Sequence, residues 1–470
     1  MIRLALPAGN VRPELGRLLV EANLPLEEYA RGSRAYVAAS PENGLRVRVF
    51  RERDIPIQIA LGNYDLGICD AAWVEELLGR YPSEAIVPLC DLGLGKRSIY
   101  VAVAASGEGD AWWEAPVVRL VSEYPGLAEA FARAARLTSY RIFPVWGAAE
   151  AYPPEDAELA LVAVEDEGDL SRNGLRPVHR LLESSVWLVA NGQSLRSKDL
   201  GRLVQPLLSL RGASNGRPLL TLPPSLARAG TGKQRDRSQL RGNTVRLALP
   251  DGHQQRHAVA ALREAGIELS GYDEETARRR PACGVEGVEV KVIRPQDMPQ
   301  QVALGNFDLA ITGRDWLLDH LYRFPSSPVK EAADLRLGSY GIAAVVSEEL
   351  PATGLDEALN VWRAEGRPFV RVASEYVNVA DHFARGRHFG RYKVVPIGGA
   401  SEGFVPEDAE LLIEGTETGA TLAANRLKII ERLFRSTTCL IASTQEPAGK
   451  RGRLVKELTG MFRRRAGPGG

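Results

Sequence analysis

The sequence predicts an α/β fold that is built twice in tandem, each copy forming two lobes with mixed, mostly parallel sheets. Three observations predict it. Blocks of sequence recur in the same order in the two halves, first 243 and later 252 residues apart. Within each copy, short apolar or β-branched runs alternate with helical patterns, which is typical of sheets covered by helices. Between the copies lies a stretch rich in Gly, Pro, Ser and Arg.

The recurring blocks indicate a duplication, because chance matches do not keep their order and spacing over so many segments. IRLALPAGN at Ile2 returns as VRLALPDGH at Val245, and RERDIPIQIALGNYDLGI at Arg51 returns as RPQDMPQQVALGNFDLAI at Arg294. Further on, RLVSEY matches RVASEY, and PPEDAELAL matches VPEDAELLI. We predict a first repeat over residues 1–210, a flexible linker over 211–243, a second repeat over 244–463 and a disordered tail over 464–470.

Each repeat reads as strand–helix–strand units followed by a second, separate run of such units. The last strand of a repeat, SSVWLVAN or STTCLIAS, is expected to return to the first lobe. Ligands are expected at the carboxyl ends of the strands, between the two lobes. In order, we expect strands at 2–7, 45–50 and 64–69 with helices near 14–22 and 55–63, a strand and helix within 117–137, a strand at 411–413 and a helix at 423–433.

Composition favours an ordinary globular protein of the cytoplasm. The chain has 59 Lys and Arg against 59 Asp and Glu, and this balance argues against a nucleic-acid binder. The sequence contains no run of about eighteen apolar residues, so no membrane span is predicted. Its start has no apolar stretch long enough for a signal peptide. The cysteines form no CxxC pair and are expected to be small core residues of a reducing compartment: Cys69, Cys90, Cys283 and Cys439.

The stretch EGTETGATL carries the chemistry that the sequence suggests most directly. It joins the apolar strand at 411–413 to the expected helix, and a glycine there lets backbone N–H groups approach an oxygen-rich ligand. Threonine hydroxyls add donors, and Thr421 could cap the helix. Two carboxylates would repel a bare phosphate, but they suit ribose hydroxyls or Mg²⁺. A sugar phosphate therefore fits this loop better than a plain phosphate, although a polar strand-to-helix turn has the same pattern.

In combination, these motifs resemble the catalytic subunit of ATP phosphoribosyltransferase, as a tandem duplication of its short form. The resemblance is carried by RLALP in each repeat, RPQDMPQQVALGNFDLAITGRDWL, DLGLGK, RVASEY and ETGATLAANRL. It implies a periplasmic-binding-protein-like (type II), two-lobed fold. It also implies a reaction of ATP with phosphoribosyl pyrophosphate, helped by Mg²⁺, and a partner similar to histidyl-tRNA synthetase. No nucleic acid or membrane is expected, and the repeats should form an intramolecular pseudo-dimer that could assemble further.

The resemblance assigns expected roles to residues of this sequence. Arg51 and Arg294 match an arginine that reaches across an interface to the nucleotide phosphates, although either could instead form a surface ion pair. Glu414 and Glu417 would face the ribose and hold the metal. The phosphate would lie against Thr418, Gly419, Ala420 and Thr421, and the nucleotide against Asp308, Thr312, Gly313 and Asp315.

The two repeats are not equally equipped for this chemistry. At the separation of 252 residues, Glu414 corresponds to Val162, and the phosphate loop corresponds to Asp166, Glu167 and Asp169. Extra carboxylates would repel a phosphate there. We therefore expect the second repeat to hold the phosphoribosyl site, with Arg51 supplied from the first.

One departure from the family keeps alternatives open. The family has a lysine after the first strand, where this chain has Ala8 and Asp251, and His253 could replace it only in part. A binding or regulatory protein of the same fold, sensing a nucleotide or amino acid, is the alternative to an enzyme. An unrelated small-molecule-binding scaffold is a third interpretation.

Overall fold

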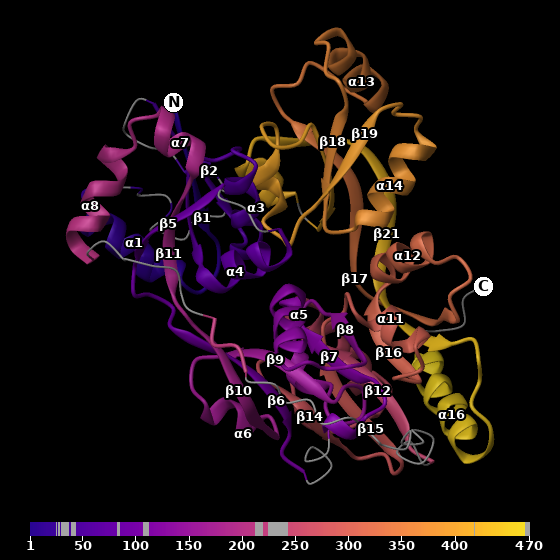
Figure 1. Ribbon diagram of the computed structural model, residues 1–470. Coiled ribbons are helices and arrows are strands. Elements are labelled where there is room, and N and C mark those ends of the chain that lie inside the picture. The colour runs from indigo at the N-terminus through magenta and orange to yellow at the C-terminus, as the bar shows by residue number, and fades with distance from the viewer. Residues whose placement is uncertain are drawn as a thin grey trace.

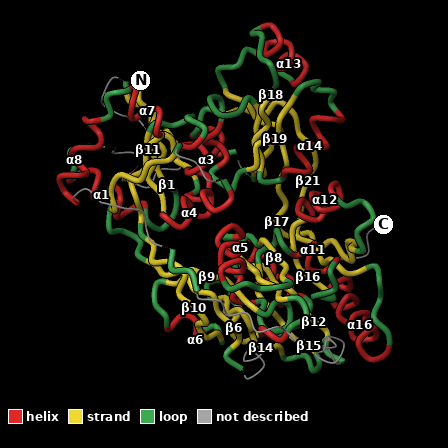
Figure 2. The backbone as a smooth tube through the Cα atoms, viewed as in Figure 1, coloured by secondary structure: helices red, strands yellow, loops and turns green. Residues whose placement is uncertain are grey.

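Each repeat folds into two lobes, so the computed structural model has four (Figure 1). It describes residues 1–24, 26, 29, 37–38, 44–81, 85–106, 112–211, 220–223, 243–417 and 419–465. We name the lobes of the first repeat A and B, and those of the second C and D. This arrangement confirms the predicted α/β class with mixed sheets. Helices lie around each sheet in Figure 2.

Lobe A is a six-stranded sheet in the order β2-β3-β1-β4-β11-β5. Its central strands β1, β3 and β4 are parallel, because helical crossovers join them. The last strand of the repeat, β11, returns to this lobe and pairs with β4 and β5, as predicted. The elements are β1 (Ile2–Pro7), α1 (Arg12–Glu21), β2 (Val37–Ala38), β3 (Leu45–Phe50), η1 (Glu52–Asp54), α3 (Ile55–Ala60), β4 (Leu66–Asp70), α4 (Ala71–Arg80), β5 (Ile86–Asp91), β11 (Val186–Asn191), α7 (Gly192–Ser197) and α8 (Gly201–Arg211).

Lobe B is a five-stranded sheet in the order β10-β6-β9-β7-β8. The predicted strand and helix within 117–137 are β7 and α5. From the expected linker, the described residues 220–223 lie against this lobe, since the Thr221 N–H donates to the Leu181 carbonyl. The elements are β6 (Arg97–Ala104), β7 (Val118–Ser122), α5 (Pro125–Ala134), β8 (Tyr140–Pro144), η3 (Ala149–Ala151), β9 (Leu159–Val164), α6 (Gly168–Arg172) and β10 (Leu175–Ser184).

Lobes C and D share one eight-stranded sheet, in the order β15-β12-β16-β21-β17-β20-β18-β19. The long strands β17 (Val329–Ser347) and β21 (Leu427–Ser443) pair along both lobes. Lobe C has β12 (Val245–Pro250), η4 (Gly252–Gln254), α10 (Gln255–Glu264), β13 (Leu269–Tyr272), β14 (Ala277–Cys283), β15 (Val288–Ile293), α11 (Met298–Ala303), β16 (Leu309–Gly313), α12 (Arg314–Arg323) and α16 (Gly449–Arg465). Lobe D has α13 (Leu355–Ala364), β18 (Val370–Ser374), α14 (Val377–Gly386), β19 (Tyr392–Pro396), η5 (Ser401–Phe404), β20 (Leu411–Thr416) and α15 (Ala420–Ala424).

The helix expected over 423–433 is wrong. Helix α15 ends at Ala424, Arg426 adopts a left-handed φ of 53°, and β21 begins at Leu427. Pairing of β21 with β17 from Leu427 to Ser443 supplies a backbone ladder that outweighs the local helical pattern. At the end of the chain, α16 continues to Arg465, two residues into the stretch expected to be a disordered tail.

The repeats pack head to tail, so that lobe A contacts lobe D and lobe B contacts lobe C (Figure 1). Each contact has its own apolar core. Phe50 and Ile55 of the first repeat pack with Phe404 and Leu412 of the second. On the other side, buried residues such as Tyr152 pack with residues of α11. This pseudo-twofold arrangement places loops of one repeat against the lobes of the other.

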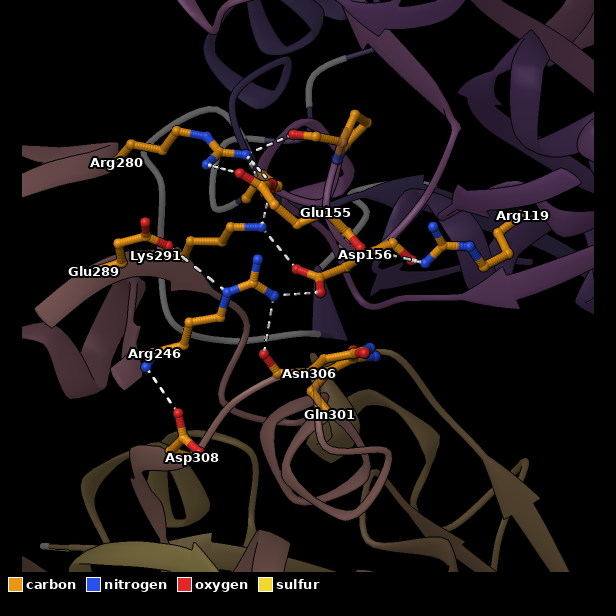
Figure 3. A network of polar contacts seen from close by, with 12 residues as sticks. Arg119, Glu155, Asp156, Arg246, Arg280, Glu289, Lys291, Gln301, Asn306 and Asp308 are labelled. Atoms are coloured by element: carbon orange, nitrogen blue, oxygen red, sulfur yellow. Dashed lines mark hydrogen bonds and ion pairs between the residues drawn. The ribbon is translucent and has the colours of Figure 1, made fainter. Parts of the chain in front are cut away.

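The PEDAE blocks that recur in the sequence lie at these two contacts. In the first repeat, the Asp156 carboxylate accepts from Lys291 Nζ at 2.6 Å and from Arg246 Nη1 at 3.2 Å (Figure 3). All three side chains are at most 4% exposed. In the second repeat, Glu407 pairs with Arg46 and Arg48 of the first. The repeated motif therefore joins the repeats through ion pairs, but with different partners on each side.

The cysteines are free thiols, and Cys69, Cys90 and Cys439 are buried as predicted, whereas Cys283 is half-buried. Among the described residues, no helix has the length and apolar character needed to cross a membrane.

Candidate functional site

The loop after β20 has the backbone expected of an oxygen-binding turn. Gly419 has a φ of 73° and stands at the N-cap of α15, so glycine provides the left-handed conformation there. Its N–H donates to Thr416 Oγ1 at 3.0 Å. Thr421 lies inside the helix, so Gly419 and not Thr421 occupies the cap position. Ala420 begins the helix, and Thr418 lies outside the described residues.

Glu414 lies among other carboxylates at the end of the same strand. Burial, followed by the charges of Glu375 and Glu402, raises the pKa of Glu414 well above its usual range. Ser401 Oγ donates to Glu414 Oε2, and the Gly415 N–H donates to Oε1 at 3.0 Å. Burial also raises the pKa of Glu375, to about 7. These carboxylates form an oxygen-rich cluster in which burial raises the pKa of Glu414 and of Glu375.

Arg51 of the first repeat reaches this cluster in the second. A Cβ placed on Gly399 would lie 2.8 Å from Arg51 Nε and 2.9 Å from a Glu375 oxygen. Glycine at position 399 therefore lets the guanidinium and the carboxylate approach together. The charge of Arg51 partly offsets the effect of burial on the pKa of Glu375. The arginine expected to cross between the repeats thus lies at the second repeat's site.

Arg294 makes the corresponding crossing to the first repeat, where Gly147 lies against its side chain. Unlike Arg51, it is held by a carboxylate of its own repeat. Arg294 Nη1 lies 3.0 Å from Asp251 Oδ1, and Arg279 Nη1 lies 2.7 Å from Asp251 Oδ2. Ala8 stands where the second repeat has Asp251, and among the described residues Arg51 has no carboxylate within ion-pair distance. The two arginines are therefore equivalent in position but not in charge neutralisation.

The residues expected to bind nucleotide divide between opposite ends of β16. Thr312, Gly313 and Asp315 lie at its carboxyl end, where Thr312 Oγ1 donates to the Pro295 carbonyl at 2.9 Å. Asp315 is fully buried and accepts from Tyr340 Oη at 2.5 Å and Ser436 Oγ at 3.0 Å.

Asp308 comes directly before β16, at the end opposite to Gly313. The two residues are about 16 Å apart, because a strand extends about 3.3 Å per residue. It accepts from the Arg246 N–H and pairs with Arg451 of α16 at 2.7 Å. Asp65 has the same role in the first repeat, accepting from the Arg3 N–H and pairing with Lys198. Asp308 therefore joins the strand to a terminal helix, at the end of β16 away from Thr312 and Gly313, and its contact with nucleotide stays a prediction.

Glu417 does not share the surroundings of Glu414. It is exposed and faces lobe C, where Arg256 Nη2 lies 3.5 Å from its Oε1 and where His253 and His257 are near. The two carboxylates are three residues apart, and the backbone turn after β20 sends them to different neighbours. The expectation that they hold one metal ion together is therefore not supported. Glu375 and Glu402 are the carboxylates near Glu414.

The loop of the first repeat lacks the phosphate-binding features. Helix α6 corresponds to α15, and its preceding residue Glu167 accepts from Tyr100 Oη at 2.9 Å. Asp169 pairs with Arg172. Between the lobes, Arg97 occupies the position that Tyr340 has in the second repeat. Arg97 Nε pairs with Asp70 at 2.6 Å, and Arg97 Nη2 pairs with Glu52 at 3.2 Å. Internal ion pairs thus fill the corresponding region.

Two buried aspartates at the crossings predict a pH dependence of stability. Asp297 accepts from the Trp146 N–H and Asp54 from the Gly398 N–H. Burial raises the pKa of Asp297 to about 8 and that of Asp54 to about 6. A raised carboxyl pKa gives stability that is complete below the unfolded pKa and is lost as the pH rises through the folded one.

We expect Asp297→Asn to gain stability relative to the unmodified chain as the pH rises from about 4 to about 8, by more than about 1 kcal/mol. The amide keeps the acceptor for the Trp146 N–H and cannot ionise. Denaturant unfolding at a series of pH values measures the difference. Asp54→Asn is the matched control, and its gain should be complete by about pH 6. A difference that does not change with pH for either variant would contradict the assignment.

Sequence reasoning missed several residues of this site. Glu375 lies in the recurring SEY block, and Glu402 and Gly399 lie in segments that align with WGAAE of the first repeat. The repeat alignment was the available signal. It shows that Glu375 and Glu402 correspond to Glu123 and Glu150, but it does not show that these blocks meet β20.

Comparison with known proteins gives a consistent result. The family model HisG: ATP phosphoribosyltransferase matches residues 51–210 and again residues 294–464. An ATP phosphoribosyltransferase from Chelativorans sp. (strain BNC1) is 29% identical over 230 residues, which cover 47% of this chain and 100% of the relative. One from Chlorobium chlorochromatii (strain CaD3) is 31% identical over 201 residues, and the match covers 43% of this chain and 64% of that protein.

Among solved structures, the chain is similar to an ATP phosphoribosyl transferase (HisG:HisZ) complex from Thermotoga maritima. The identity is 18% and the TM-score 0.37, with 47% of this chain and 98% of that chain covered. The sequence matches carry the assignment. The family model matches most of each repeat. This chain therefore belongs to the ATP phosphoribosyltransferase family, the pentosyltransferases of histidine biosynthesis.

Proposed function

We propose that the chain has one phosphoribosyl-transfer site, in the second repeat, completed by Arg51 of the first. In this reaction N1 of the ATP adenine forms a bond to C1 of the ribose of phosphoribosyl pyrophosphate, while the bond from C1 to the pyrophosphate oxygen breaks. The reaction needs no protein nucleophile. It needs two polyanions held in line and stabilisation of charge on the leaving group.

The loop between Thr416 and Thr421 would take the ribose 5′-phosphate. Its support is the left-handed Gly419, which stands at the N-cap of α15 and whose N–H donates to Thr416 Oγ1. Glu414 at the end of the same strand would accept hydrogen bonds from the ribose hydroxyls. The fully buried Asp315, with Thr312 and Gly313, lies at the carboxyl end of β16, which β21 and β17 separate from β20 in the shared sheet, and these residues would contact the nucleotide.

The observation that carries the proposal is the difference between Arg51 and Arg294. Ala8 and Asp251 are equivalent in position, since each follows a strand whose last residue pairs with the residue before the arginine: Pro7 with Phe50 and Pro250 with Ile293. Asp251 neutralises Arg294, which faces the repeat without a phosphate loop. Arg51 faces the repeat that has one. Among the residues that the structure describes, the arginine that has no carboxylate within ion-pair distance therefore faces the repeat with the Gly419 turn.

We expect Ala8→Asp to lower turnover about tenfold, the effect of about 1.4 kcal/mol, because the new carboxylate would hold Arg51 as Asp251 holds Arg294. Arg51→Ala should lower it more, about 100-fold. The assay mixes the chain with ATP, phosphoribosyl pyrophosphate and Mg²⁺, and follows the N1-ribosylated product by absorbance.

Asp251→Ala is the matched control and should leave turnover within about twofold, because it releases an arginine at the repeat without the loop. An unchanged rate for Arg51→Ala would remove the crossing arginine from the mechanism. Absence of product from the unmodified chain, with and without a histidyl-tRNA-synthetase-like subunit, would favour a regulatory protein of the same fold.

Enzymes of this family need a metal, and we propose that the ion is Mg²⁺. The donors that would suit it are the carboxylates of Glu414, Glu375 and Glu402, since hard oxygen ligands are those that Mg²⁺ prefers. When bound, such an ion would neutralise pyrophosphate charge. We further propose that the chain works in the cytoplasm, where both substrates are found.

A further inference from the structure

A cluster of two histidines and one glutamate joins lobes C and D beside the phosphate loop. His253 lies in η4 and His257 in the first turn of α10, both in lobe C, while Glu417 follows β20 in lobe D. One ligand atom from each residue lies within 4.8 Å of the others. We propose that His253, His257 and Glu417 bind a transition-metal ion of the zinc type, which links the two lobes.

The three ligand atoms already face a common cation. Arg256 Nε donates to His257 Nε2 at 3.2 Å, and Arg256 Nη2 lies 3.5 Å from both His253 Nε2 and Glu417 Oε1. Ring nitrogens that accept from a guanidinium present their lone pairs to it, as they would to a metal. Because the Arg256 side chain is 51% exposed, it can leave for solvent when an ion takes its place.

The donor set suits zinc or cobalt better than magnesium. Imidazole nitrogens and one carboxylate are typical ligands of Zn²⁺, and three protein ligands leave a fourth position for another oxygen. Ligand atoms about 2.0–2.1 Å from a tetrahedral ion are about 3.3 Å apart. The exposed side chains of His253 and Glu417 must therefore move inward by roughly an ångström.

The backbone holds His257 in place for this role. Gly338 of β17 has a φ of 59°, and a Cβ there would come within 3 Å of the imidazole ring. The ring thus packs directly on backbone. The first repeat has no such cluster, because Asn10, Glu14 and Glu165 occupy the corresponding positions. The histidines therefore occur only in the repeat that retains the phosphate loop.

Cobalt titration of the full, metal-free chain tests the proposal, since Co²⁺ bound by nitrogen ligands in this geometry absorbs visible light. We expect one equivalent to bind and Zn²⁺ to displace it. His253→Gln and His257→Gln should each weaken binding at least tenfold, and Glu417→Gln should weaken it less. The control is His382→Gln, which should bind Co²⁺ normally. His382 lies in α14 of lobe D, and its ring stacks on Tyr322 of α12 in lobe C.

Arg256→Gln distinguishes a metal site from an anion site. Removal of the competing cation should tighten Co²⁺ binding by up to about tenfold, whereas an anion site would lose affinity for pyrophosphate in the same variant. The proposal is overturned if no visible band develops, if binding survives in His253→Gln, or if Arg256→Gln weakens pyrophosphate binding and leaves Co²⁺ binding unchanged. His253 is exposed, so its substitution should not prevent folding. None of these readouts requires turnover.

Discussion

Asp156→Ala is expected to lower the free energy of unfolding by about 3–5 kcal/mol, the loss typical of removing one partner from a buried ion pair. The substitution would leave Lys291 Nζ with Glu155, at 2.9 Å, as its remaining carboxylate. Arg246 would keep its 3.7 Å contact to the exposed Glu289 and a 3.5 Å hydrogen bond to the Asn306 carbonyl. Both cations are 4% exposed, so water cannot solvate them in the folded state. Denaturant unfolding followed by circular dichroism at neutral pH measures the loss.

The second repeat provides a matched control in Asp408, which occupies the equivalent position. Asp408 accepts from Tyr64 Oη at 2.9 Å, while the neighbouring Glu407 pairs with Arg46 and Arg48. Asp408→Ala should therefore lose only about 1–2 kcal/mol, because a hydroxyl and not two cations loses its partner. Equal losses at the two positions would show that the network in Figure 3 does not stabilise the fold as described.

Gly419→Asp is expected to reduce turnover by at least about 1,000-fold. A carboxylate about 4 Å from a phosphate near a protein surface is repelled by about 4 kcal/mol, which corresponds to about three powers of ten in rate. The side chain has room, since a Cβ at this position would meet no atom within 4 Å. Product formation from ATP and phosphoribosyl pyrophosphate, measured by absorbance, gives the rate.

Gly419→Asn separates charge from backbone strain. Asparagine has the shape of aspartate and tolerates a left-handed φ comparatively well, so its loss should stay below about tenfold. In the first repeat, Glu167→Gly should leave the rate within about twofold, because that loop has no phosphate to bind. Similar rates for Gly419→Asp and Gly419→Asn would mean that the loop does not meet a phosphate.

Much of the fold could be predicted from local pattern. The strands of lobe A and the return of the last strand follow from apolar runs that alternate with helices, and the duplication follows from matched blocks. The expected helix at 423–433 failed because β21 takes its conformation from pairing with β17, whose paired residues lie 80 or more positions earlier in the chain. Long-range pairing of this kind leaves no short-range signal.

The candidate site was predictable only in part, for a related reason. Strand order places Thr312 and Asp315 at a carboxyl end, but a residue just before a strand, such as Asp308, lies at the opposite edge. The neighbours of Glu414 come from separate blocks that meet only after the lobes form. The family resemblance predicts that Arg51 crosses between the repeats. Its difference in charge neutralisation from Arg294 could be recognised only from the Arg294–Asp251 contact in the structure.

The head-to-tail packing of the two repeats has a consequence for how the protein behaves on dilution. When such an arginine comes from a separate subunit, the site loses it as the protein concentration falls below the dissociation constant of the two subunits. Here Arg51 belongs to the same chain as Glu375, so their encounter is intramolecular and has a fixed effective concentration. The amount of protein in solution therefore does not determine whether Arg51 reaches Glu375.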